Sequence, residues 1–154
     1  MITVPFVAVS SRPALDRLAR LCFSGIYFPT RFASRAPLII ALCAQRATLV
    51  EAGKSIKDRA MFQLDCGIAG EHLVLRAAEL GLGTCWIGWF HRGGARKALG
   101  VPVAVRVVAL ISVGYPDKSL QPRRKVRRSL DQVLFRDSWG SEFPGAADQG
   151  EVEK

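Results

Sequence analysis

Three apolar segments of the chain have the pattern of β-strands. Residues Pro37–Ala44 (PLIIALCA) contain no charged side chain, which is typical of a strand covered on both faces. Val103–Pro116 is dense in valine and is broken by Gly114 and Pro116, so it predicts a central strand that leads into a turn. Val4–Ser10 (VPFVAVS) predicts a further strand near the start of the chain.

Three other segments have the spacing of helices. In Ala14–Phe23, leucines recur at helical spacing with charged residues opposite them. Asp65–Leu80 is the strongest helix prediction, and Gly81 is expected to end it in a left-handed conformation. Gly94–Leu99 predicts a short helix that stops at Gly100. In the long helix, the residues expected to face the core are Cys66, Ala69, Gly70, Leu73, Ala77 and Leu80, and those expected to face solvent are His72, Arg76 and Glu79.

Strands that alternate with helices predict an α+β fold, an α/β sandwich with a central mixed sheet flanked by helices. The length of 154 residues fits one globular domain. We expect this domain at residues 1–140 and a polar, disordered tail at residues 141–154. Ser24–Ala36 is less regular, and Ala47–Arg59 is expected to form a loop or the start of a helix.

Residues 81–90 read GLGTCWIGWF and place glycines beside two tryptophans. Glycine permits the close approach of another group and tryptophan offers a wide apolar surface, so the stretch has the features of a turn around a flat group. The alternative is structural: a glycine ends the helix, and a buried strand that happens to hold two indoles follows it. Taken alone, the stretch favours the structural alternative.

The formal net charge of +9 raises the hypothesis of nucleic-acid binding, because basic surfaces attract phosphate. Much of this charge is clustered between Pro116 and Leu130. The basic residues of the cluster are Lys118, Arg123, Arg124, Lys125, Arg127 and Arg128. No aromatic residue lies among them, which counts against a stacking surface for single strands. A nucleic-acid-binding domain is therefore the less favoured alternative.

The chain lacks the patterns of several other classes. Its four cysteines, Cys22, Cys43, Cys66 and Cys85, form no CxxC pair, which predicts reduced, mostly buried thiols and no metal site. No apolar stretch is long enough to span a bilayer, and no basic residue precedes the first apolar run, so a cytoplasmic protein is expected. No side chain is assigned a catalytic role, because no convincing triad is present.

The order of these segments resembles the FMN-dependent nitroreductase family. Four stretches carry the resemblance: Asp65–Phe90 (DCGIAGEHLVLRAAELGLGTCWIGWF), Ala95–Pro102 (ARKALGVP), Val108–Asp117 (VALISVGYPD) and Pro122–Leu134 (PRRKVRRSLDQVL). With Pro37–Ala44, they extend it from about Val4 to Gly140. Each stretch is weak by itself, whereas their ordered series is fairly specific.

The resemblance implies an intertwined homodimer with FMN bound at the interface. It places Ile87, Gly88 and Trp89 along the flavin ring, and Lys125 and Arg127 at the FMN phosphate, which suits their charge. It also implies that NAD(P)H reduces the flavin and that a nitroaromatic, a quinone or a similar acceptor then takes two electrons. Trp89 and Phe90 would give such rings a flat apolar wall.

The resemblance begins at the first strand. The family's usual N-terminal helices, with an arginine-rich phosphate motif and a Ser/Asn loop, have no counterpart here, and Arg12, Arg31 and Arg35 do not reproduce that motif. Either the true start lies upstream or this is a truncated or diverged member. A folded, non-catalytic remnant of the family is therefore an alternative function.

Overall fold

The chain divides into two units, Met1–Asp117 and Lys118–Lys154. The computed structural model describes residues 3–45, 61–117, 119 and 126–144. The elements of the first unit are β1 (Phe6–Val9), α1 (Arg12–Cys22), the 3₁₀ helix η1 (Gly25–Arg35), β2 (Leu38–Gln45), α2 (Met61–Glu79), β3 (Gly83–Ile87), α3 (Arg92–Leu99) and β4 (Val105–Gly114). Each of the three predicted strands is therefore confirmed.

The strands form one sheet of four, in the order β1-β2-β4-β3. Every pairing among them is antiparallel, with partners such as Ile40 and Ile111, so the predicted α+β class is confirmed but the sheet is not mixed. The apolar run of β2 indicates burial on both faces, and this burial comes from helices on either side of the sheet. An apolar run carries no information on strand direction, and the expectation of a mixed sheet was therefore wrong.

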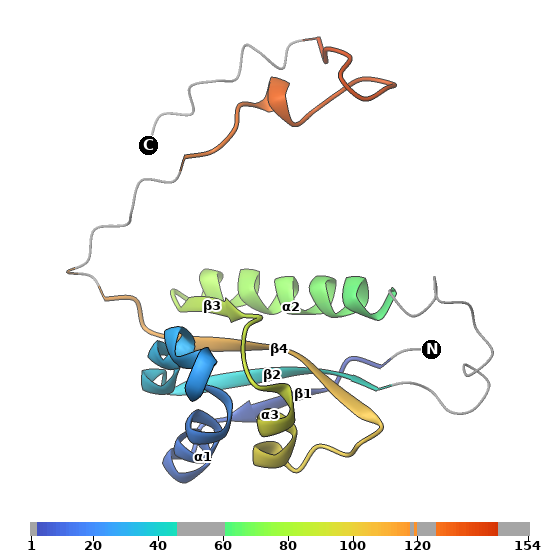
Figure 1. The fold of residues 1–154 in the computed structure, drawn as a ribbon. Coiled ribbons are helices and arrows are strands. Elements are labelled where there is room, and N and C mark those ends of the chain that lie inside the picture. The colour runs from blue at the N-terminus through green and yellow to red at the C-terminus, as the bar shows by residue number, and fades with distance from the viewer. Residues whose placement is uncertain (1–2, 46–60, 118, 120–125, 145–154) are drawn as a thin grey trace. The chain divides into compact units, whose positions relative to one another are not determined.

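Helices cover both faces of the sheet, and consecutive residues of β2 alternate between two cores. Ile39 and Cys43 pack with α1 and α3 on one face. Leu42 and Ala44 lie in the cores on the other face, where α2 packs. Figure 1 shows α2 on one side of the strands and α1 and α3 on the other. Each large apolar side chain that is fully buried in this way contributes about 1.5–3 kcal/mol.

Helix α1 forms where the leucine spacing predicts it. Leu15, Leu18 and Cys22 are buried on one stripe, and Pro13 occupies the first turn, where its missing N–H costs nothing. The irregular segment that follows is the 3₁₀ helix η1, which the sequence did not indicate. Its pattern is weak because only Ala33 of η1 is buried and because Pro29 lies inside it.

Helix α2 is longer than predicted and has a different outer face. It begins at Met61 rather than Asp65, and Phe62, which precedes the predicted start, is buried beside Ala44. The expected core residues Cys66, Gly70 and Ala77 are buried, but Leu80 lies beyond the helix and is exposed. The outer face also carries exposed apolar residues, namely Leu64, Ile68 and Leu75, where a polar surface was expected.

Glycines end two helices as predicted. Gly81 has φ 73° and follows α2, and the Leu82 N–H donates to the Ala77 carbonyl at 2.9 Å, which closes the last turn. Gly100 has φ 64° and ends α3. Gly83 does not turn the chain, since it is the first residue of β3. The structural alternative therefore holds for the helix end, whereas the strand that follows, β3, is not buried throughout, because Cys85 and Trp86 are exposed.

The second unit contains a short 3₁₀ helix, η4 (Leu130–Gln132), and an isolated antiparallel bridge between Phe135 and Glu142. The rings of Phe135 and Trp139 pack with centroids 5.0 Å apart. The predicted limits of the domain, residues 1–140, stay a prediction. Residues 145–154 of the predicted tail and the predicted loop Ala47–Arg59 lie outside the described residues.

Candidate functional site

The connection between β3 and α3 is a short loop that is anchored at both ends. Ile87 pairs with Leu110 in the last rung of the β3–β4 ladder, and its side chain is buried. Phe90 is also buried, and the His91 N–H donates to the Cys22 carbonyl at 3.0 Å. Between these anchors, Gly88 and Trp89 are exposed. The loop therefore presents a glycine and an indole on a rigid base.

Gly88 has free space around its α-carbon. A Cβ built there meets no atom of the described residues within 4 Å, and the residue is not among those with positive φ. Within the described part of the chain, the N–H groups of Gly88 and Trp89 donate no backbone hydrogen bond. The loop thus offers two backbone donors beside open space.

Trp89 has an aromatic neighbour that the sequence did not identify. The ring of Tyr27, from η1, lies 6.0 Å from the Trp89 ring in an edge-on arrangement and 5.9 Å from the His91 ring. Trp89 keeps 52% of its surface exposed. Tyr27 is therefore the contact missed by sequence reasoning, because it belongs to a segment 62 positions away that has no clear pattern.

Two aromatic residues of the stretch do not belong to this surface. Phe90 is 3% exposed and packs in the core, so the prediction that it forms part of a flat wall is wrong. Trp86 pairs with Ile111 and packs against Gly70 of α2, where a Cβ would lie 2.7 Å from Trp86 Cζ2. Alternation along β3 sends Trp86 toward α2 and Ile87 toward α1 and α3. Only one of the two indoles is available to a ligand at the loop.

The predicted phosphate-binding residues belong to the second unit. Arg127 is exposed there, as is its neighbour Arg128. Lys125 lies outside the described residues, as do Lys118, Arg123 and Arg124 of the basic cluster. The roles of Lys125 and Arg127 stay predictions.

The cysteines are free thiols, and all except Cys85 are buried. Burial raises the pKa of the Cys22 thiol to about 12, and it also raises the pKa values of Cys43 and Cys66. These buried thiols are therefore protonated at neutral pH and are poor nucleophiles. The expectation of mostly buried, unpaired thiols is confirmed.

Among the described residues, no cluster of three His, Cys, Asp or Glu side chains is placed to hold a metal ion. Across the same ranges, no helix has the length and hydropathy needed to cross a bilayer.

The loop at Gly88 and Trp89 fits a flat ring with polar edges, such as the flavin of FMN. The open space at Gly88 admits a ring edge, and the N–H groups of Gly88 and Trp89, which donate to no backbone carbonyl of the described residues, suit acceptor atoms on that edge. The exposed indole of Trp89 supplies an apolar surface beside it. Ile87, Gly88 and Trp89 are therefore brought together as a candidate ring-binding site.

Several known proteins are similar to this chain in sequence and in fold. A protein of Archaeoglobus fulgidus named "Putative NADH dehydrogenase/NAD(P)H nitroreductase" is 30% identical over 138 residues, which cover 87% of this chain and 73% of that protein. The crystal structure of a nitroreductase family protein from Clostridium novyi NT is 29% identical, has a TM-score of 0.60, and matches over 91% of this chain and 73% of that one. An FMN-dependent nitroreductase from Clostridium difficile R20291 is 26% identical with a TM-score of 0.64, over 89% of this chain and 76% of that one.

The family model for nitroreductases matches residues 28–115. This range begins in η1, one residue after Tyr27, and includes β2, α2, β3, the loop at Gly88 and Trp89, α3 and β4. It therefore includes most of the first unit and the candidate site. The chain belongs to the nitroreductase family.

Proposed function

We propose that this protein is an FMN-dependent oxidoreductase that moves two electrons from NAD(P)H to a nitroaromatic, a quinone or a similar acceptor. The observation that carries the proposal is the loop after β3, where Gly88 has open space beside the exposed ring of Trp89. In the described part of the chain, the N–H groups of both residues donate no backbone hydrogen bond. Relatives named as NAD(P)H nitroreductase and FMN-dependent nitroreductase support it.

In this proposal the chain binds and orients, and the cofactor supplies the redox chemistry. FMN, when bound, would supply the redox chemistry, which is the transfer of two electrons from NAD(P)H, as hydride, to the acceptor. Ile87, which is buried at the end of β3, fixes the loop, and the Gly88 and Trp89 N–H groups would hold the flavin edge by hydrogen bonds. Trp89, with Tyr27 at 6.0 Å, gives an aromatic acceptor a flat apolar surface. Because NAD(P)H is the reductant, we place the protein in the cytoplasm.

The FMN phosphate is assigned to Lys125 and Arg127. An arginine binds a phosphate dianion with two parallel hydrogen bonds, and a lysine adds a compact positive charge. Arg127 is exposed and available for such a contact. Its neighbour Arg128 is equally exposed and has no assigned role, so the two residues form a matched pair for an experiment.

Flavin content tests the proposal directly. The purified protein is denatured, released FMN is measured by absorbance, and the apoprotein is titrated with FMN by fluorescence. We expect stoichiometric FMN, and we expect Arg127→Ala to weaken FMN binding by about 10–100-fold, because a hydrogen bond to a charged group contributes about 1.5–3 kcal/mol. Arg128→Ala should change the affinity by less than about twofold.

Oxidation of NADH and of NADPH with a nitroaromatic or a quinone is then measured on the loaded protein. A chain that binds no FMN at micromolar concentration contradicts the proposal and favours a non-catalytic family member. Salt-dependent binding to RNA by a flavin-free protein would instead favour the nucleic-acid alternative.

We also propose that the protein is a homodimer, with FMN at the interface. Leu64, Ile68 and Leu75 form an apolar stripe on the outer face of α2, interrupted by Glu71, and are 55%, 50% and 55% exposed. An exposed apolar stripe on a helix opposite its core face is typical of a protein interface. A second copy of the chain is the occupant that the family resemblance favours.

Substitution of Ile68 by lysine tests this interface. A charge at the centre of the stripe should raise the dimer dissociation constant by at least about tenfold, because it must be desolvated on association. Gln63→Lys is the control, since Gln63 is exposed on a different face of the same helix. Sedimentation equilibrium measures both variants. An unchanged dimer with Ile68→Lys would place the interface elsewhere.

A further inference from the structure

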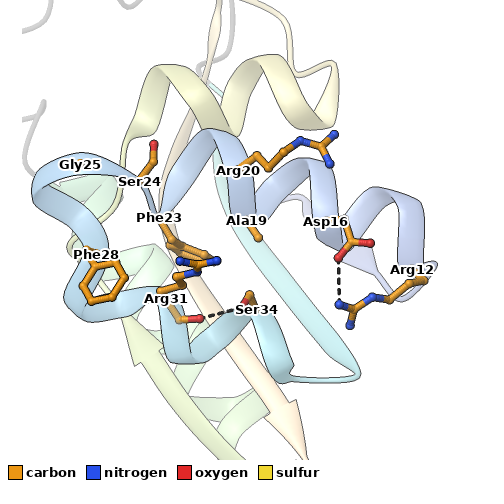
Figure 2. Close-up of a pocket in the computed structure, with 10 residues that line it drawn as sticks. All are labelled: Arg12, Asp16, Ala19, Arg20, Phe23, Ser24, Gly25, Phe28, Arg31 and Ser34. Atoms are coloured by element: carbon orange, nitrogen blue, oxygen red, sulfur yellow. Dashed lines mark hydrogen bonds and ion pairs between the residues drawn. The ribbon is translucent and has the colours of Figure 1, made fainter.

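A groove lies between α1 and η1. It has a volume of about 670 Å³, and both helices line it, as Figure 2 shows. Phe23, which is buried, and Phe28 give it an apolar part, whereas Arg12, Asp16, Arg20 and Arg31 give it charge. The groove therefore combines aromatic surface with a basic rim.

The charges of the groove favour an anion. Three guanidinium groups and one carboxylate line it, which leaves a net charge of +2. Arg12 is paired with Asp16 at 3.0 Å. Across the described ranges, no ion pair joins Arg20 or Arg31 to a carboxylate. Two arginines are thus available to a ligand, and arginine pairs are well suited to phosphate.

The aromatic surface favours a ligand with a flat ring as well as a phosphate. The ring of Phe28 is 61% exposed, and Arg31 Cζ lies 5.8 Å from its centroid. A nucleobase stacks on phenylalanine rings and on guanidinium planes. A stacking surface beside arginines that form no ion pair with a described residue is typical of a site that binds a nucleotide and its phosphate.

Residues of η1 contribute to the groove and also contact the loop at Gly88 and Trp89. Phe28 lines the groove, and the preceding residue, Tyr27, contacts the ring of Trp89. The same helix therefore supplies a residue to each of the two places. A dinucleotide has an extended form, with a ring at each end and phosphates between them.

We propose that the groove binds the adenosine end of NADPH, with the 2′-phosphate on Arg20 and Arg31 and the adenine beside Phe28. Arginine is the residue that accommodates this phosphate in other NADPH-binding sites. The inference rests on the proposed oxidoreductase function, because it assigns a place to the co-substrate. It makes NADPH, rather than NADH, the preferred reductant.

The test uses 2′,5′-ADP, which carries the 2′-phosphate but has no nicotinamide and takes no part in redox chemistry. Calorimetric titration of the full chain should show binding that Arg20→Ala and Arg31→Ala each weaken by about tenfold or more. Arg17→Ala on α1 and Arg35→Ala on η1 are the controls, since both residues are exposed and neither lines the groove. The controls should bind within about twofold of the parent.

Further arms identify the source of the phosphate. AMP, which lacks the 2′-phosphate, should bind at least about tenfold more weakly than 2′,5′-ADP. Inorganic phosphate that binds as tightly, with the same dependence on Arg20 and Arg31, would show a simple anion site and overturn the proposal. Unchanged affinity in Arg20→Ala and Arg31→Ala, or no binding of 2′,5′-ADP, would overturn it as well.

Flavin content, measured on the same samples, separates this inference from the proposed function. Arginine-dependent binding of 2′,5′-ADP by a protein without FMN would support the groove and contradict the redox function. An FMN-loaded protein that does not bind 2′,5′-ADP would contradict the role proposed for the groove and leave the redox function standing. Far-UV circular dichroism of each variant checks that it is folded.

Discussion

Replacing Gly88 by leucine is expected to remove FMN binding while leaving the fold intact. A Cβ at Gly88 meets no atom of the described chain within 4 Å, and the residue does not need positive φ, so the side chain costs the apoprotein little. The same side chain would fill the space proposed for the flavin edge. We expect the FMN dissociation constant to rise by at least about 100-fold, equivalent to about 2.7 kcal/mol.

A graded series sharpens this prediction. Gly88→Ala adds one methyl group and should weaken FMN binding less than Gly88→Leu, whereas the melting temperature of both apoproteins should stay within about 2 °C of the parent. Fluorescence titration gives the affinity, and circular dichroism of the flavin-free proteins gives the melting temperature. Retention of parental affinity by Gly88→Leu would mean that the loop does not approach the flavin.

Replacing Gly94 by alanine is expected to have the largest effect on stability. A Cβ at Gly94 would overlap the Leu21 carbonyl oxygen and lie 2.7 Å from its carbon and 2.9 Å from His91 Nδ1. Two of these atoms belong to the backbone of α1, so α1 and α3 would have to move apart. We expect a loss of about 3 kcal/mol, the upper end of the usual overpacking cost, and a fall in melting temperature of about 10 °C.

Gly93 provides the matched control for this substitution. It lies in the same helix, but a Cβ there meets only the His91 ring, at 3.7 Å. Gly93→Ala should therefore be neutral or stabilising by up to about 1 kcal/mol, because alanine favours the helix over glycine. Thermal and urea unfolding of both variants measure the difference. Equal stability of the two variants would show that close packing at Gly94 does not hold the helices together.

The pattern of the chain predicts elements best where one face is buried in a simple way. The leucine stripe of α1 and the apolar run of β2 are local signals of burial, and both were confirmed. Helix α2 was predicted too short because its outer face carries Leu64 and Ile68, which blur the amphipathic pattern. The 3₁₀ helix η1 was not predicted, because it buries too few residues to produce a periodic pattern of apolar positions.

The candidate site shows the same division. Glycine beside tryptophan was visible in the sequence, and the family resemblance singled out Gly88 and Trp89. The contact of Tyr27 with Trp89 was not visible, because it joins two segments that lie far apart in the sequence. The burial of Phe90 was not visible either. The sequence does not distinguish an aromatic residue that packs in the core from a neighbouring one that stays exposed.

The sequence by itself determined the α+β class and which residues end the helices, because these depend on local periodicity and on the freedom of glycine at positive φ. The family followed from the resemblance of an ordered series of motifs. The tertiary structure alone decided the antiparallel order β1-β2-β4-β3, the close contact at Gly94, and the groove between α1 and η1. These depend on contacts between segments far apart in the chain, and a periodic pattern records that a face is buried but not what buries it.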